Sequence, residues 1–333
     1  MFVGIVTVGI IGAGWIAREH RRVLGSVPGA EVAAVCDLDT ERARALAAGT
    51  PARVYADWRD LLDREDLGAL LVCTPPRSHA EPAVAALSAG LPVYLEKPIA
   101  RTPGEAAPIV AAAERSGTVC AVGYQWHALD LLGDLPGLLA GQQIGALAGT
   151  CIGPTQSRPW FLDRRAGGGN LLERGSHHID LARAVAGEVA AVQAAAGQVR
   201  LARSTGEAAG DIDDVLTMLL QHASGALTTI VVAWTRPGQP GSFSLDILAS
   251  EATLRLALDP DFTLTGVSGG QQVSRRAEAH PFERSMRRFL RAVAERDPAA
   301  VACTPRDAAA TLAVAVAAER ALETSRAVRV GTR

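Results

Sequence analysis

The sequence predicts two domains: an α/β domain with a doubly wound parallel sheet, then an α+β domain with one open, mainly antiparallel sheet. At 333 residues the chain exceeds the usual size of a single domain. Short apolar runs alternate with helical patterns up to residue 123, whereas long strand-like segments dominate after it. This change of pattern divides the chain into domains 1–123 and 124–333.

In the first domain, continuous apolar runs separated by helices are typical of parallel strands covered on both faces. Asp57, Thr40 and Thr102 stand at expected helix N-caps, and Gly90 and Gly117 at expected helix ends. The predicted strands are 3–11, 32–36, 69–73, 93–95 and 119–122, and the predicted helices are 15–24, 40–48, 58–63, 79–89 and 103–116.

The second domain has the pattern of an antiparallel meander with few helices. Its predicted strands are 147–152, 190–201, 215–222, 226–234, 243–249, 252–258, 262–265 and 328–330, and its predicted helices are 128–140, 171–186, 282–296 and 306–325. Because two terminal helices cannot cover both faces of such a sheet, we expect a homodimer or homotetramer formed through the free face.

A glycine-rich turn follows the first strand, with Gly12, Gly14 and Ala17 in a GxGxxA pattern. Glycines at this place let backbone N–H groups, including those of Trp15 and Ile16, approach a pyrophosphate at a helix N-terminus. The sequence therefore predicts a Rossmann dinucleotide-binding domain. The alternative is a βαβ unit whose glycines only allow tight packing.

The second strand ends at Asp37, 25 residues after Gly12, near the ~20 expected for an acid that binds the adenosine ribose. A carboxylate there accepts hydrogen bonds from both ribose hydroxyls of NAD and repels the 2′-phosphate of NADP. We therefore expect NAD, with NADP disfavoured. A helix cap at this point falls more naturally to Asp39 or Thr40.

Ligands of open parallel sheets bind beyond the carboxyl ends of the strands. Thr74 and Pro75 follow the strand at 69–73 and are expected to lie along the cofactor, as is His79, for which a packed turn is the alternative. Glu96 and Lys97 follow the strand at 93–95. The Lys97 ammonium is expected to reach the cofactor crevice and bind a substrate hydroxyl; the alternative is a surface pair with Glu96.

A second group of polar residues lies in a predicted helix after three glycines at 167–169. Glu173, His177 and Asp180 are spaced by four and three residues and would share one helical face, where carboxylates can orient an imidazole as acid or base. Gly175 within the helix suggests a close backbone approach. The alternatives are a surface ion-pair stripe or a metal pair that uses His178.

Composition and charge exclude several classes of function. The formal net charge of −2 gives no electrostatic reason to expect nucleic acid or an anionic membrane as a partner. No apolar run reaches the ~20 residues of a membrane span, and the N-terminal stretch lacks the pattern of a signal peptide. Five scattered cysteines without a CxxC pair disfavour a metal site and fit a reducing cytoplasm.

These motifs together resemble the glucose–fructose oxidoreductase / inositol dehydrogenase (Gfo/Idh/MocA) family. The segments 12–17, 74–79, 96–98 and 167–180 come in the order and spacing of that family, and the likeness covers essentially the whole chain. The resemblance implies a Rossmann domain joined to an open-sheet domain and a nicotinamide cofactor. It also implies oxidation or reduction of a sugar, cyclitol or related polyol by dimers or tetramers.

The resemblance assigns catalytic roles to Lys97 and His177, which flank the reacting hydroxyl in that family. An Asp commonly stands four residues before the His, and Glu173 occupies that position here. Many members carry Asn or Arg around the positions of Gln125 to His127, where substrate and nicotinamide meet. We expect His177 to take the hydroxyl proton, Lys97 to position the oxygen, and Glu173 or Asp180 to orient the imidazole.

Two alternative functions remain. The same family resemblance allows NAD-dependent glycoside hydrolysis, in which a transient hydride transfer acidifies a neighbouring C–H bond. A non-catalytic regulator that binds dinucleotide or sugar is the other, because the fold alone does not decide function.

Overall fold

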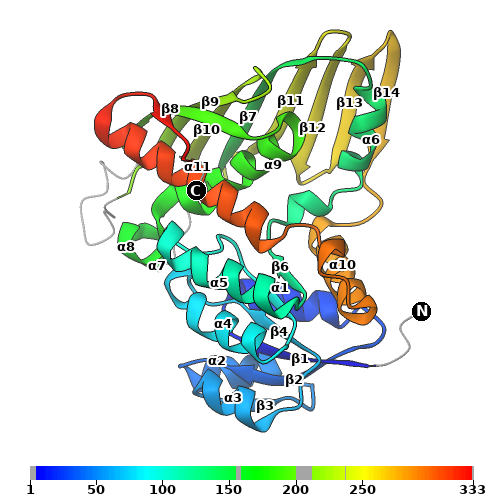
Figure 1. Cartoon of the computed structure of the whole chain (residues 1–333), viewed down its shortest axis with the longest axis vertical. Coiled ribbons are helices and arrows are strands. Elements are labelled where there is room, and N and C mark those ends of the chain that lie inside the picture. Colours follow the sequence, from blue (N-terminus) through cyan, green and yellow to red (C-terminus); the bar gives the residue numbers. More distant parts are fainter. Residues whose placement is uncertain (1–4, 155–158, 200–211, 237, 332–333) are drawn as a thin grey trace. The chain divides into compact units, whose positions relative to one another are not determined.

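The computed structural model describes residues 5–154, 159–199, 212–236 and 238–331, and their contacts form two compact units (Figure 1). Unit 1 comprises Met1–Ala128 and Pro281–Ala309, and unit 2 comprises Leu129–His280 and Ala310–Arg333. Each unit contains one sheet. None of the helices in the described residues is long and apolar enough to cross a membrane.

The sheet of unit 1 has six parallel strands in the order β3-β2-β1-β4-β5-β6. The strands are β1 (Val6–Ile11), β2 (Ala30–Cys36), β3 (Arg53–Tyr55), β4 (Ala69–Val72), β5 (Val93–Leu95) and β6 (Cys120–Val122). The chain reverses its direction of travel across the sheet between β1 and β4. This is the doubly wound order with a switch point, as predicted. The sequence missed β3, a short, partly exposed edge strand without an apolar run.

Helices and short 3₁₀ turns connect these strands. They are α1 (Trp15–Leu24), α2 (Thr40–Ala47), α3 (Trp58–Arg64), η1 (Pro76–Ser78), α4 (Ala80–Ser88), α5 (Pro103–Ser116) and η2 (Gln125–Ala128). The predicted caps Asp57 and Thr102 are confirmed, since each side chain accepts a backbone N–H of its helix. Thr40 was wrong as a cap: the Asp39 carboxylate accepts the first N–H groups of α2.

The helix α10 (Pro281–Glu295) belongs to unit 1, followed by η5 (Pro298–Ala300). Its side chains Met286, Phe289 and Leu290 are buried in the same core as Val8 and Tyr94. The single boundary at 123/124 placed α10 in the second domain, and these contacts correct that placement. Because the helix returns to the first sheet from far along the chain, its local pattern does not show which core it joins.

The sheet of unit 2 has nine strands in the order β14-β13-β12-β11-β7-β10-β9-β8-β15. The strands are β7 (Ile144–Pro154), β8 (Val189–Gly197), β9 (Val215–His222), β10 (Leu227–Thr235), β11 (Ser242–Ala249), β12 (Ala252–Asp259), β13 (Thr263–Ser268), β14 (Gln271–Arg276) and β15 (Val328–Arg329). All pairs are antiparallel except β7 with β10, which confirms a mainly antiparallel sheet. The sequence missed the exposed edge strand β14. The predicted strand 190–201 ends beyond β8, and its residues 200–201 lie outside the described residues.

The helices of unit 2 are α6 (Leu131–Leu138), α7 (Pro159–Leu162), α8 (Arg164–Gly167), α9 (Ser176–Ala186) and most of α11 (Pro305–Thr324). In Figure 1, α9 and most of α11 lie on one side of the sheet. The buried side chains of Met218, Ile230 and Val232 point to this covered face.

The predicted single helix 171–186 is two elements. Leu171–Gly175 forms a π-helical turn, η3, which leads into α9. A Cβ on Gly175 would lie 3.3 Å from Met218 Cε and 3.6 Å from Val232 Cγ2. The close approach predicted at Gly175 is therefore an approach to the sheet.

Candidate functional site

The carboxyl ends of the unit 1 strands bring the first set of predicted site residues together. Cys73 N–H donates to the Ile11 carbonyl over 2.7 Å, and Glu96 N–H donates to the Val72 carbonyl over 2.9 Å. Gly123 N–H donates to the Leu95 carbonyl over 2.8 Å. The segments that follow β1, β4, β5 and β6 are thus neighbours at one edge of the sheet.

The glycine turn between β1 and α1 uses its two glycines differently. Gly12 has φ +92°, and a Cβ there would lie 2.7 Å from the Cys73 carbonyl oxygen, so only glycine fits. Gly14 is the N-cap of α1, and a Cβ there would meet nothing within 4 Å. The chain thus leaves the N-terminus of α1 open at Trp15, which is half exposed, and Ile16. This arrangement fits a dinucleotide pyrophosphate.

Asp37 is tied to this turn. Its Oδ2 accepts the Ala13 N–H over 2.7 Å, and its Oδ1 accepts the Asp39 N–H over 2.9 Å. Since Asp39 caps the next helix, Asp37 is not the helix cap. The carboxylate therefore stands beside the glycine turn, where a ribose acceptor is needed.

His79 has the packed-turn geometry that the sequence left as an alternative. The ring is fully buried, with Nε2 2.9 Å from the Thr74 carbonyl and Nδ1 3.0 Å from the Pro98 carbonyl. Burial lowers the pKa of His79. The side chain links the turn after β4, which contains Thr74 and Pro75, to the segment after β5.

Glu96 and Lys97 differ in exposure. Glu96 is buried, whereas Lys97 is half-buried at the strand end, and the Lys97–Pro98 peptide bond is cis. Glu96 Oε1 lies 2.6 Å from His20 Nε2, a buried contact that the sequence gave no reason to expect. Lys97 is the single lysine of the chain, among 33 Lys and Arg residues in total, a feature that the sequence reasoning did not use.

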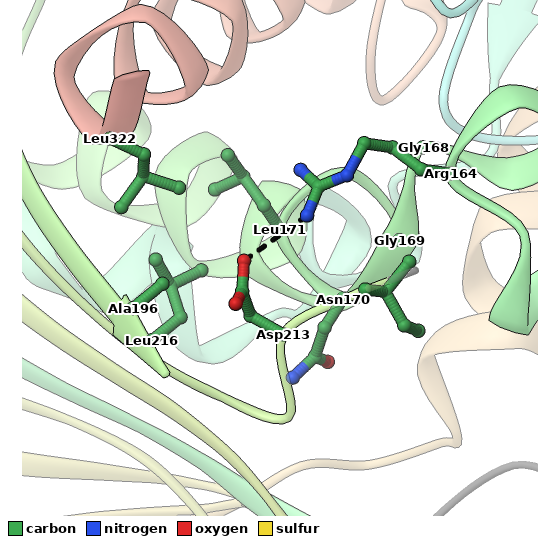
Figure 2. A pocket seen from close by; sticks show the side chains of 10 residues that line it. Arg164, Gly168, Gly169, Asn170, Leu171, Ala196, Asp213, Leu216 and Leu322 are labelled. Carbon is green, nitrogen blue, oxygen red and sulfur yellow. Dashed lines mark hydrogen bonds and ion pairs between the residues drawn. The ribbon is translucent and has the colours of Figure 1, made fainter. Parts of the chain in front are cut away.

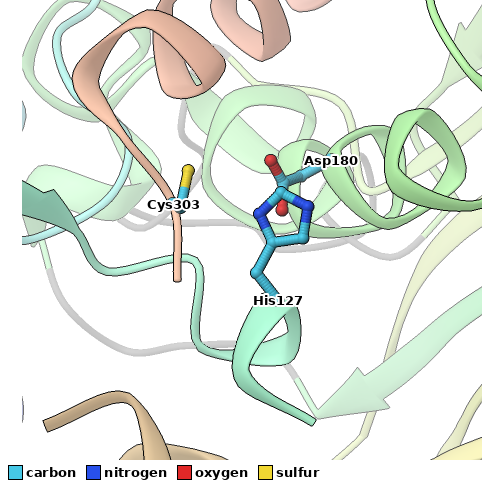
Figure 3. A group of neighbouring side chains, drawn as sticks. All are labelled: His127, Asp180 and Cys303. Carbon is cyan, nitrogen blue, oxygen red and sulfur yellow. The ribbon is translucent and has the colours of Figure 1, made fainter. Parts of the chain in front are cut away.

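Beyond β6 the chain turns through η2. Gln125 is half-buried there, and its N–H donates to the Gly123 carbonyl over 3.0 Å. Figure 3 shows the next histidine, His127, on η2, and Cys303 on the segment before α11. The Cys303 carbonyl accepts the Val122 N–H over 2.9 Å, which holds that segment against β6.

In unit 2, the residues predicted to share one helical face lie on two kinds of helix. Glu173 is half-buried in the π-helical turn, and His177 is half-buried in the first turn of α9. A π turn is wider than an α turn, so the i, i+4 spacing no longer fixes their relation. π-helical turns within helices are frequent at functional sites.

Asp180 is buried on α9 and belongs to a network with α11, and Figure 3 shows its side chain. Thr311 Oγ1 donates to Asp180 Oδ1 over 2.9 Å and accepts from Arg183 Nη1 over 2.7 Å. Arg183 in turn makes two bonds to Glu188. Asp180 therefore anchors α9 in unit 2 through Oδ1.

His178 points to the sheet. It is fully buried, its Nε2–H donates to the Ser244 carbonyl over 3.2 Å, and burial lowers its pKa to about 4. A Cβ on Gly149 would lie 3.0 Å from His178 Cδ2, which shows how closely β7 packs on the ring. This environment suits a neutral packing histidine and gives no support to the alternative of a metal pair.

A narrow pocket, partly open to solvent, lies in unit 2 (Figure 2). Arg164 and Asp213 form an ion pair of 3.1 Å across it, and its apolar wall includes Leu171 and Leu216. Asn170 also lines it, only 3% exposed, and within the described part of the chain neither polar atom of its amide has a hydrogen-bond partner. Such buried, unpaired polar groups are rare in folded proteins. The sequence reasoning missed Asn170.

Comparison with known proteins gives the family. Residues 6–124 match the model of the oxidoreductase family with an NAD-binding Rossmann fold (GFO_IDH_MocA), and residues 146–255 match the GFO/IDH/MocA C-terminal domain. The chain belongs to the GFO/IDH/MocA oxidoreductase family.

Two of the relatives are dehydrogenases by name. D-apiose dehydrogenase of Paraburkholderia graminis is 30% identical over 265 residues, 75% of this chain and 67% of the relative. Inositol 2-dehydrogenase of Klebsiella pneumoniae is 43% identical over 112 residues, a match that spans only 33% of each chain. The structure of GenD2 from gentamicin A biosynthesis in complex with NAD superposes with a TM-score of 0.85 at 25% identity, over 100% of this chain and 98% of GenD2.

The buried His178 makes the protein sensitive to acid. Its folded-state pKa of about 4 lies below the ~6.5 of the unfolded chain, so the unfolded state binds the proton first as the pH falls. Between pH 6.5 and 4 the free energy of unfolding should fall by about 3 kcal/mol through this group. Urea unfolding at pH 7 and pH 4.5 measures the loss.

The control is His178→Gln, which keeps a donor for the Ser244 carbonyl and does not titrate. Its stability should depend less steeply on pH than that of the wild type. Equal pH dependence in the two proteins would contradict the assignment.

Proposed function

We propose that the protein is an NAD-dependent dehydrogenase that transfers a hydride between the nicotinamide and a carbinol carbon of a sugar, cyclitol or related polyol. The observation that carries the proposal is the position of Lys97. In a chain whose other basic side chains outside histidine are all arginine, the one lysine stands at the end of β5, on the same edge of the sheet as the dinucleotide turn. The names of the relatives, D-apiose dehydrogenase and inositol 2-dehydrogenase, support the class of substrate.

Lysine offers what arginine does not. Its ammonium is a compact charge with rotatable donors on a flexible stem, whereas the guanidinium is a planar, rigid fork. In the oxidative direction, bound NAD supplies the hydride acceptor. Lys97 donates a hydrogen bond that positions the hydroxyl oxygen, and His177 takes the hydroxyl proton as the carbonyl forms.

Glu173 or Asp180 orients the His177 imidazole in this proposal. Glu173 suits the role by its partial exposure, and Asp180 is engaged with Thr311 through Oδ1. The dinucleotide is held by the open N-terminus of α1 at Gly14 and by Asp37. Thr74, Pro75 and Gln125 lie at the same strand edge and would contact the nicotinamide half.

Removing either reacting group should stop turnover without unfolding the protein. Lys97→Ala and His177→Ala should each lower kcat by about 10²-fold or more, the usual worth of a positioned acid–base group. Lys97→Arg should not restore activity, because it keeps the charge and replaces the compact ammonium by a larger, planar guanidinium. Steady-state assays of NAD reduction with a panel of sugars and cyclitols, with NAD binding by fluorescence as the folding control, measure this. Near-normal turnover in both alanine variants would remove the proposal.

Asp37 should set the preference for NAD over NADP. Removing its charge in Asp37→Asn keeps an acceptor for the Ala13 N–H but weakens the bonds to the ribose, so kcat/KM for NAD should fall about tenfold. The selectivity ratio should move toward NADP, since the repulsion of a 2′-phosphate is removed. An unchanged ratio would show that Asp37 does not read the ribose.

We also propose that the protein forms a homodimer or homotetramer through the uncovered face of the unit 2 sheet. Leu219, Val231 and Leu248 lie on that face, half exposed or exposed, while their strand neighbours are buried under the helices. Apolar side chains gathered on one sheet face favour a second copy of the same face as partner.

Val231→Glu should shift the assembly toward monomer, because the charge would be buried at the interface. Ala45→Glu on the exposed face of α2 in unit 1, away from the unit 2 sheet, is the control. Light scattering coupled to size exclusion measures both masses, and a wild-type monomer at micromolar concentration would contradict the interface.

The five cysteines are all buried, and none of them forms a disulfide. Buried thiols outside disulfides are typical of proteins from a reducing compartment. We therefore propose a cytoplasmic location.

A further inference from the structure

A buried histidine–carboxylate pair lies directly behind Lys97. His20 on α1 is fully buried and Glu96 is 5% exposed, and His20 Nε2–H donates to Glu96 Oε1 over 2.6 Å. The pair joins the dinucleotide-binding helix to the end of β5. The two residues are 76 positions apart in the chain, so only the fold brings them together.

The second oxygen of the carboxylate faces Lys97. The Lys97 backbone N–H donates to Glu96 Oε2 over 3.1 Å. Gly123 packs on the carboxyl group so closely that a Cβ there would lie 3.0 Å from Oε1 and 3.2 Å from Oε2. The carboxylate is therefore held from three sides, and its orientation fixes the direction of the Lys97 N–H and hence of the Lys97 backbone.

The ring of His20 is itself held by aromatic contacts. Tyr94 and Phe282 meet it edge-on, with ring centroids 5.1 and 5.9 Å away. The Tyr94 hydroxyl hydrogen-bonds to Ser285 Oγ over 3.0 Å. Nδ1 of His20 is buried and has no hydrogen-bond partner among the described residues. The polar contact of the ring is thus the one to Glu96.

Stability alone does not explain this pair. A buried charged or polar pair is often no more stabilising than apolar side chains of similar volume, and its documented use is to specify one conformation. His20 leaves one polar atom unpaired in the core, which adds a cost. The geometry suits a pair that orients Lys97, the residue that follows Glu96.

We propose that His20 is a positioning residue for Lys97 and acts through Glu96. The proposal rests on the proposed function, which gives Lys97 its role at the reacting hydroxyl. His20 fixes the Glu96 carboxylate, the carboxylate fixes the Lys97 peptide, and the ammonium leaves the backbone in one direction. Since His20 lies on α1, it fixes the position of Lys97 relative to the helix that holds the cofactor.

The first test compares two substitutions of His20. His20→Gln places an amide donor where Nε2 lies and can keep the bond to Glu96, whereas His20→Leu removes the donor. His20→Leu should lower kcat by about tenfold or more, as expected from loss of orientation. It should change the KM for NAD by less than about threefold, because the glycine turn is untouched. His20→Gln should recover most of the activity.

A matched control separates positioning from general destabilisation. Ser285→Ala removes the hydrogen bond to Tyr94 in the same core and leaves the Glu96 contacts unchanged. It should lower Tm and leave kcat unchanged. Equal losses of kcat in Ser285→Ala and His20→Leu at equal Tm would overturn the proposal, as would full activity of His20→Leu.

The second readout does not depend on turnover. Because the chain contains one lysine, protein grown on ¹³Cε-lysine and made without a lysine-containing tag gives one Cε resonance. This resonance should move or broaden in His20→Leu and stay near its wild-type position in His20→Gln and Ser285→Ala. An identical spectrum in all four proteins would refute the positioning role. If the spectra behave as expected but no polyol reduces NAD, the proposed function fails and the support of Lys97 by His20 stands.

Discussion

The tight packing around Gly12, the residue that follows β1, is the constraint on which the dinucleotide site depends. The Gly12 N–H bonds to the Cys36 carbonyl over 2.7 Å, and its Cα packs against the Cys73 carbonyl. The ends of β2 and β4, the two strands that flank β1, therefore contact a residue that has no side chain. The ends of β2 and β4 meet the start of α1 there, so Asp37 and Thr74 reach the same edge of the sheet. A larger residue at Gly12 would push these strand ends apart.

The sequence predicted the parts of this fold that depend on local sequence patterns. Alternating apolar runs and helices predicted the parallel sheet, and the glycine turn with Asp37 predicted its dinucleotide edge. The short edge strands β3 and β14 carry no apolar run and were missed for that reason. The membership of α10 in unit 1 was missed because the contact of Phe289 with a core formed near Tyr94 is a property of tertiary packing.

The candidate site was predictable to a similar depth. Strand ends and helix spacing made Lys97 and His177 candidates, and their roles remain a prediction; these local patterns gave no sign of the contacts behind Lys97. The contact of His20 with Glu96 joins two elements far apart in the chain and leaves no motif. The π-helical turn at 171–175 was hidden by a sequence that also fits an α-helix, and it changes which side chains share a face.

The segment around α9 divides its polar residues by burial. His177 is half-buried, His178 is neutral against the sheet, and Asp180 holds α11 through Thr311. Adjacent residues of one helix thus have different roles, because side chains that are neighbours in sequence point in directions about 100° apart. His178 and Asp180 hold the helix in place through their packing and hydrogen bonds, and this fixes the position of His177.

In the proposed function, Lys97 and His177 act on one hydroxyl beside a bound nicotinamide. A crystal structure of the protein with NAD and a polyol that it oxidises tests this directly. The account predicts Lys97 Nζ and a ring nitrogen of His177 each at about 3 Å from the reacting oxygen. A complex in which either nitrogen lies far from that oxygen, with no water between, would contradict it.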